Sequence, residues 1–271
     1  MICTSGKKAG MKKNVRPELA LAFFLGMILS SVNAQAAHPL ITDDTGIQGK
    51  GKTQIELNGE YAWDRETGEG IEVKERALAL ESVVSYGVMD SLDLVLTLPY
   101  TSVRDTVDGA TTRQNGANDL SAELKWQFWE GKGTSFAFKP GVSFPTGDEK
   151  KGLGTGKYGV SAFLIGTQEL ERWTFHVNLG YLRNNNNFEE EENLWHASLA
   201  SEWKASGAVR LVANMGMEKN ADPAAEKDPS FALVGFIYAM SEGLDIDLGY
   251  KAGLNDPEMD QTVLAGMALR F

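Results

Sequence analysis

Histidine and serine are the first side chains to weigh for covalent chemistry, and the chain has three histidines. His196 and Ser198 are two residues apart, a spacing that places both on one face of a β-strand. A histidine beside a serine is the start of a nucleophilic site, so a barrel lipid hydrolase is one alternative. No nucleophile motif surrounds Ser198, however. We therefore expect ordinary polar side chains here and no enzymatic activity.

Carboxylates are plentiful, but their spacing predicts neither a metal site nor a cofactor site. The calcium-loop pattern D-x-D-x-D-G-x5-E does not occur. The run Glu189–Glu192 could hold Ca²⁺ or bridge lipopolysaccharide through divalent ions, although a run of like charge is more often a solvated loop. The glycine-rich stretch 152–156 lacks the G-K-[ST] ending of a phosphate loop. We expect no metal and no cofactor.

The remaining charged residues alternate with apolar ones, most clearly between Leu244 and Phe271. Period two is typical of a strand with one apolar and one polar face, and each run has about the 9–11 residues that a tilted strand needs to cross a bilayer. The apolar face would contact lipid, and the polar face would line a lumen. The same phase gives the candidate lumen-lining residues: Glu56, Glu60, Asp93, Glu123, Lys125, Lys139, His176, Arg210, Asp245, Asp247 and Lys251.

Segments of this kind account for most of the chain. We expect strands at about 52–63, 73–87, 92–102, 118–129, 134–144, 157–168, 173–183, 194–204, 208–218, 230–240, 244–252 and 262–271. The segment 230–240 is apolar on both faces, so its phase stays open. Short turns alternate with polar loops that are mostly longer, and these loops include 64–71 and 103–117.

Short turns at one end and longer loops at the other are typical of bacterial outer-membrane barrels, whose short turns are periplasmic. A closed barrel also leaves no strand edge unpaired, and lipid would penalise each orphan backbone group by several kcal/mol. The predicted fold class is all-β, an antiparallel transmembrane β-barrel of about 12 strands. We expect it in the outer membrane of a Gram-negative cell, with both termini periplasmic.

The amino terminus has the pattern of a cleaved signal peptide at 1–36. Basic residues precede an apolar core at 19–29, and Ala34-Gln35-Ala36 offers a cleavage site. Met11 is an alternative start, which would place residues 1–10 upstream of the protein. Residues 37–51 show no periodicity. We expect them to form a periplasmic lead-in, either outside the lumen or tucked into it, before a barrel of residues 52–271.

Charge and class define the expected partners. Loss of the signal peptide removes five of 26 basic residues and one of 37 acidic residues, which leaves a net charge of −15. That sign disfavours nucleic acid as a partner. The expected partners are outer-membrane lipid and lipopolysaccharide, the barrel-assembly machinery and a small-molecule solute.

Short motifs recur through the mature chain: His38-Pro39-Leu40, Thr42-Asp43-Asp44-Thr45, Leu98-Pro99-Tyr100, Gly116-x-x-Asp119-Leu120, Lys125-Trp126-x-Phe128, Lys139-Pro140-Gly141 and Pro145-Thr146-Gly147. Together they resemble the bacterial outer-membrane family labelled "putative MetA-pathway of phenol degradation", often called transporter. The resemblance implies an outer-membrane barrel that admits small, often aromatic, molecules, and it defines no functional residues. The end of the chain resembles the assembly signal of outer-membrane barrels at Gly266, Leu269 and Phe271, with leucine in place of the usual aromatic residue at 269.

These features predict a passive channel, or transporter, for small molecules, hydrophobic or aromatic ones among them. The main alternative is a closed structural or adhesive barrel whose acidic loops bind outside partners. A barrel of about 12 strands is narrow, so inward charges could either line a pore or plug it with ion pairs. The strand number leaves both possibilities open.

Overall fold

The computed structural model of the chain describes residues 38–68 and 71–271, and the predicted signal peptide at 1–36 lies outside the described residues. Within the described part, no helix is long and apolar enough to cross a membrane. The elements are β1 (Thr53–Gly68), β2 (Ile71–Met89), β3 (Leu92–Val107), β4 (Ala110–Ala117), β5 (Leu120–Gly131), β6 (Thr134–Phe144), the 3-10 turn η1 (Glu149–Lys151), β7 (Gly159–Glu169), β8 (Trp173–Arg183), β9 (Asn193–Lys204), β10 (Val209–Glu218), β11 (Ser230–Ser241), β12 (Leu244–Gly253) and β13 (Gln261–Arg270).

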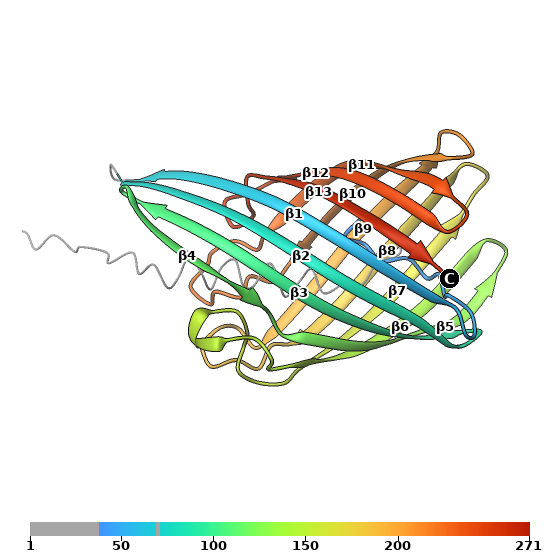
Figure 1. The fold of residues 1–271 in the computed structure, drawn as a ribbon, viewed down its shortest axis with the longest axis horizontal. Coiled ribbons are helices and arrows are strands. Elements are labelled where there is room, and N and C mark those ends of the chain that lie inside the picture. Colours follow the sequence, from blue (N-terminus) through green and yellow to red (C-terminus); the bar gives the residue numbers. More distant parts are fainter. Residues whose placement is uncertain (1–37, 69–70) are drawn as a thin grey trace, which may run out of the picture.

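All strands except β4 form one closed antiparallel barrel (Figure 1). Neighbours in the chain are neighbours in the sheet, and β1 pairs with β13 from Gln54↔Arg270 to Trp63↔Gln261, which closes the ring. A closed ring has no row of unpaired backbone groups, so its wall can face a medium that offers no hydrogen bonds. The prediction of an antiparallel barrel of about 12 strands is confirmed.

The hairpins of β1 to β4 extend well beyond the other strands (Figure 1). Residues 64–68 continue β1, residues 103–107 continue β3, and β4 pairs only with residues 100–107 of β3. The predicted loops at 64–71 and 103–117 are therefore wrong. These extensions are mostly polar, so they lack the clear alternation that reveals a strand. An ion pair between Arg65 on β1 and Glu72 on β2 joins the two strands instead, and Lys74 on β2 lies 2.5 Å from the same carboxylate.

Elsewhere the two faces of the wall follow the predicted phase. The outer face of β8 exposes Trp173, Phe175, Val177, Leu179 and Tyr181, and its inner face buries Thr174, His176 and Asn178. The structure also fixes the phase of β11, which the sequence leaves open: Phe231, Leu233 and Ile237 are buried inside, and Val234, Phe236 and Tyr238 are exposed outside. The result is a continuous apolar belt around a largely polar interior.

The two ends of the barrel differ in their connections. At the end that carries Phe271, the connections 90–91, 132–133, 170–172, 205–208 and 242–243 are short (Figure 1). At the other end, the segments 145–158, 184–192, 219–229 and 254–260 are longer. This asymmetry agrees with the predicted alternation of turns and loops.

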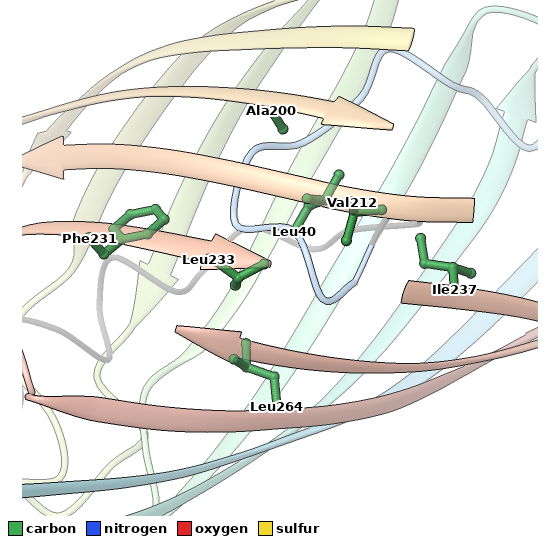
Figure 2. Close-up of a cluster of buried hydrophobic side chains, with 7 residues drawn as sticks. All are labelled: Leu40, Ala200, Val212, Phe231, Leu233, Ile237 and Leu264. Atoms are coloured by element: carbon green, nitrogen blue, oxygen red, sulfur yellow. The ribbon is translucent and has the colours of Figure 1, made fainter. Parts of the chain in front are cut away.

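The main apolar cluster inside the barrel includes Leu40, which precedes the first strand. Leu40 is 2% exposed and lies in one cluster with buried side chains of β9, β10, β11 and β13 (Figure 2). These side chains are Ala200, Val212, Phe231, Leu233, Ile237 and Leu264. The segment before β1 therefore lies within the barrel, where it buries apolar surface that would otherwise face a water-filled lumen.

The barrel lumen as the candidate functional site

The lead-in, residues 38–51 of the described chain, crosses the interior and touches strands around the whole ring. At its start, His38 Nδ1 lies 2.5 Å from Asp247 Oδ1 on β12. At its end, the Gln48 N–H donates to Asp93 Oδ2 on β3 at 3.0 Å. The lead-in is thus a plug that is covalently continuous with β1.

Wall amides hold the lead-in backbone. Asn214 on β10 accepts from the N–H groups of Ile41 at 2.7 Å and Thr42 at 3.1 Å, and donates to the Thr42 hydroxyl at 2.7 Å. Asn178 on β8 can bind the backbone of Asp43 in the same way, with its amide 2.7 Å from the nitrogen and 2.9 Å from the carbonyl oxygen. An irregular segment cannot pair its own backbone N–H and C=O groups, so these side-chain amides supply hydrogen bonds that a neighbouring strand would otherwise provide.

Lysines of the wall bind the lead-in aspartates. Lys125 Nζ on β5 lies 2.9 Å from Asp43 Oδ1 and 3.2 Å from Asp44 Oδ1. Lys139 Nζ on β6 lies 3.0 Å from Asp43 Oδ2 and 3.3 Å from Glu123 Oε2. Both lysines and Asp43 are almost completely buried. Loss of one partner in such a cluster leaves an uncompensated buried charge, which costs about 3–5 kcal/mol.

The same charges act on the second aspartate of the lead-in. Burial would raise the pKa of the Asp44 carboxyl, but the nearby charges of Lys125 and His176 and the N–H of Gly46 outweigh burial and hold this pKa well below its ordinary value. Asp44 is therefore an anion at neutral pH. The lead-in carries two negative charges into a wall that supplies the matching positive ones.

A second network braces the wall away from the lysines. Arg210 on β10 reaches Glu202 at 2.8 Å and Asp245 at 3.2 Å, and Arg270 on β13 reaches Asp245 at 2.9 Å. Arg270 Nε also donates to Gln54 on β1 at 2.8 Å, across the closure of the ring. Inward ion pairs therefore fill part of the lumen, as the plugging alternative expects.

The predicted lumen-lining residues all lie on the inner face, either buried or half-buried. Lys125, Lys139, Asp93 and Asp247 contact the lead-in. The others bind within the wall or line cavities; Lys251, for example, lies 3.0 Å from Glu258 and 5.6 Å from the centre of the Phe231 ring. Four of the others each contact a neighbour on the inner face: Glu56 contacts Gln54, Glu123 contacts Lys139, His176 contacts Glu202, and Arg210 contacts Asp245. Glu60 lines a cavity. Their role toward a solute stays a prediction.

Sequence reasoning missed several residues of the site. Asp43 shows no periodic signal of its own. Asn214 falls on the inner face of its strand by alternation, but nothing in the sequence indicates that it binds the lead-in, which is far away in the chain. Glu81 was missed for a different reason: β2 gave a clear outer face but no inward set. Its inward position follows from strict alternation with the exposed Leu80, and that signal could have found it.

Two cavities flank the lead-in. One is a partly open space of about 40 Å³ between residues 38–41 and the inner faces of β1 to β3, with Glu60 and Glu81 in its lining. The other opens at the short-turn end, has about 560 Å³, and lies between residues 46–48, β1, the turn 242–243 and the end of β13. On β1, Gln54 lines the second cavity and donates at 2.6 Å to Glu56, which is buried between the two spaces.

The spacing of His196 and Ser198 suits nucleophilic catalysis, but the surroundings of Ser198 do not. Ser198 Oγ lies 2.9 Å from His196 Nε2, and His196 Nδ1 lies 3.4 Å from Glu218 Oε2. The serine is 6% exposed, and the rings of Phe163 and Phe231 pack nearby. Among residues 38–68 and 71–271, no group of three His, Cys, Asp or Glu side chains could hold a metal ion.

The predicted assembly signal lies at the closing seam. Phe271 is 72% exposed, its N–H donates to the Thr53 carbonyl at 2.9 Å, and its carbonyl accepts from the Thr53 N–H at 3.2 Å. Gly266 and Leu269 pair with Asn58 and Ile55 of β1. The position fits a terminal strand that is recognised before closure, and the assembly role stays a prediction.

Comparisons with known proteins agree with this architecture. A protein-family model described as "Putative MetA-pathway of phenol degradation" matches residues 41–271. An outer membrane channel from Pseudomonas putida F1 is similar, with a TM-score of 0.65 and 14% identity over 84% of this chain and 98% of that one. The translocator domain of the autotransporter NalP from Neisseria meningitidis has a TM-score of 0.52 and 13% identity, over 82% of this chain and 89% of that one. The NanC porin has a TM-score of 0.53 and 9% identity, over 79% and 98%. No curated protein matches the chain.

Proposed function

The chain belongs to the family described as putative MetA-pathway of phenol degradation, and from this premise we propose that it is an outer-membrane channel for passive entry of small molecules. Hydrophobic and aromatic molecules are among the solutes we propose, because the family description names phenol degradation. Both termini would face the periplasm, since β1 begins, and the chain ends at Phe271, at the end with short connections.

The observation that carries the proposal is a closed wall that is apolar outside and polar inside, with open space on both sides of the lead-in. An apolar belt on a strand wall suits lipid, and a polar interior suits water and solutes. The fold shared with an outer membrane channel supports the same conclusion.

The lead-in determines the route that a solute would take. Its ion pairs join it to β5 and β6, and its amide contacts join it to β8 and β10. The flanking cavities instead lie toward β1 to β3 and β13. We therefore place the route between the lead-in and β1, past Gln54 and Glu56.

The test is reconstitution of the purified, processed protein in planar bilayers and liposomes. We expect discrete conductance steps and entry of small uncharged solutes in liposome swelling. Folding is checked in parallel by the heat-dependent shift in electrophoretic mobility that closed barrels show. Folded protein that neither conducts nor admits solutes would contradict the channel.

A closed structural or adhesive barrel is the second candidate, because the lead-in fills the centre of the lumen with buried ion pairs. Its acidic outer loops, such as 184–192, would then bind a partner. Deletion of that loop distinguishes the two: a closed barrel loses partner binding and never conducts, whereas a channel keeps its conductance. Outer-membrane lipid, lipopolysaccharide and the barrel-assembly machinery are proposed partners in either case.

A further inference from the structure

The cavity between the lead-in and β1 to β3 has an unusual polar lining. Glu60 on β1 and Glu81 on β2 both line it, and so does Asn58, which pairs directly with Glu81 across the strands. Directly paired residues have Cβ atoms about 5 Å apart, and Glu60 follows Asn58 on the same face. Three oxygen-bearing side chains therefore converge on one space.

These groups have no donor of their own in the described chain. Within residues 38–68 and 71–271, neither Glu60 nor Glu81 has a hydrogen bond or an ion pair within 4 Å. Asn58 is only 8% exposed, and its Oδ1 is buried without a hydrogen-bond partner. A buried acceptor without a donor costs about 1–3 kcal/mol. The three acceptors therefore suit a positively charged, hydrogen-donating occupant.

The surrounding wall cannot supply that occupant. The basic residues of β1 to β3 are Arg65, Lys74, Arg76 and Arg104, and all lie in the outer extensions of the strands. Across the lumen, Lys125 and Lys139 are bound to lead-in aspartates and to Glu123. Lys251 on β12, whose charge also acts on Glu60, is bound to Glu258 at 3.0 Å. Within the described residues, Glu60 and Glu81 therefore have no cation in direct contact.

The rest of the lining is mainly apolar and includes Leu40, Ile41, Ala79, Pro99 and Leu264. His38, Tyr100 and Thr101 also line the cavity, and His38 Nδ1 is bound to Asp247 at 2.5 Å. A small metal ion would leave this apolar surface unused, and no cluster of three metal-binding side chains is found in the described residues. A neutral alcohol or phenol has a single hydroxyl donor, which is too few for the three acceptors. The two carboxylates would repel an anion. An ammonium group has three donors and a full charge.

We propose that this cavity binds a small organic ammonium ion, an amine on a short apolar body. The ammonium group donates to Glu60, Glu81 and the Asn58 carbonyl oxygen, and the apolar body contacts Leu40 and Leu264. The inference rests on the proposed channel for the route by which the ligand enters. It adds a ligand class that the family description does not name.

The test uses n-butylamine as the probe and n-butanol as its neutral match, by calorimetry on the folded, processed protein in detergent at neutral pH. We expect n-butylamine to bind and n-butanol to bind at least about tenfold more weakly, because a charged hydrogen bond is worth about 1.5–3 kcal/mol. Glu60→Gln and Glu81→Gln should each weaken n-butylamine about tenfold for the same reason. Glu75→Gln is the matched control, since Glu75 is an inward carboxylate of β2 that does not line the cavity.

Three results would overturn the inference: no binding of n-butylamine to folded protein, equal binding of amine and alcohol, or equal loss in Glu75→Gln and in the two cavity variants. Folding of every variant is verified by heat-dependent electrophoretic mobility. Conductance is recorded on the same preparations. Conduction without amine binding rejects the ammonium site and leaves the channel standing, whereas amine binding without conduction supports the site and rejects the channel.

Discussion

Ser198 Oγ lies 2.9 Å from His196 Nε2, and the second ring nitrogen faces Glu218 at 3.4 Å. This is the order of nucleophile, base and acid in hydrolases. A hydrolase also needs room for substrate and donors for the oxyanion. Ser198 is 6% exposed, and His196 packs edge-on against Phe163 with ring centres 6.0 Å apart. These three side chains are better explained as a row of polar groups on the inner wall that hydrogen-bond to one another.

We predict that Ser198→Ala leaves function unchanged. The folded variant should match the parent in single-channel conductance, because the serine does not line either cavity beside the lead-in. The parent itself should not hydrolyse p-nitrophenyl esters or react with a fluorophosphonate. Stoichiometric labelling of the parent that disappears in Ser198→Ala would instead establish a hydrolase.

At the scale of residues, alternation was enough to assign the inward side chains of most strands. Period two is a property of the strand backbone itself, so Glu123, Lys139 and Asp245 could be placed without any tertiary information. Their partners could not. Lys139 binds Asp43, which is 96 positions away in the chain, and nothing local in either segment specifies that contact.

At the scale of elements, the lead-in decides how much of the lumen is open. Its apolar residue Leu40 lies in a cluster with side chains of β9, β10, β11 and β13 (Figure 2). Its Asp43 binds the lysines of both β5 and β6. The lead-in is therefore held by burial of an apolar side chain on one side of the lumen and by ion pairs on the other. This arrangement holds the segment across the ring without any secondary structure of its own.

Deletion of residues 38–48 should raise the unit conductance several-fold, because it removes the side chains that cross the lumen. Single-channel recording in planar bilayers measures the change. Asp43→Asn is a milder companion variant, since it keeps the segment and removes one carboxylate from Lys125 and Lys139; we expect lower stability and more frequent opening. A folded deletion variant with the conductance of the parent would show that the lead-in does not limit flow.

The strands that cross the membrane were predictable, and the outer extensions were not. A crossing strand must present apolar residues to lipid, which produces alternation in β8, β10 and β12. Residues 64–68 and β4 lie beyond that constraint, so both of their faces are polar and they resemble loops in sequence. The lead-in has no repeat for a similar reason: its conformation is set by the barrel around it.

At the scale of the whole molecule, the apolar belt and the acidic chain have separate roles. The belt fixes the depth of the barrel in the bilayer, because each outward leucine, valine or aromatic ring would be costly to leave in water. The negative charge is carried by the lumen and the loops, where water or ion pairs can accommodate it. The average composition therefore looks ordinary although the surface is strongly divided.

A charge on the belt should cost free energy according to its depth. Leu179 is 56% exposed near the middle of β8, and Met89 is 57% exposed at the end of β2 beside a short turn. Arginine at the midplane of a barrel costs about 2–4 kcal/mol, and near the interface about 0–1 kcal/mol. We therefore expect Leu179→Arg to lower the free energy of unfolding from liposomes much more than Met89→Arg. Urea titration followed by tryptophan fluorescence measures both. Because the two positions are equally exposed, equal losses would mean that the belt does not face lipid, and the membrane location would then have to be abandoned.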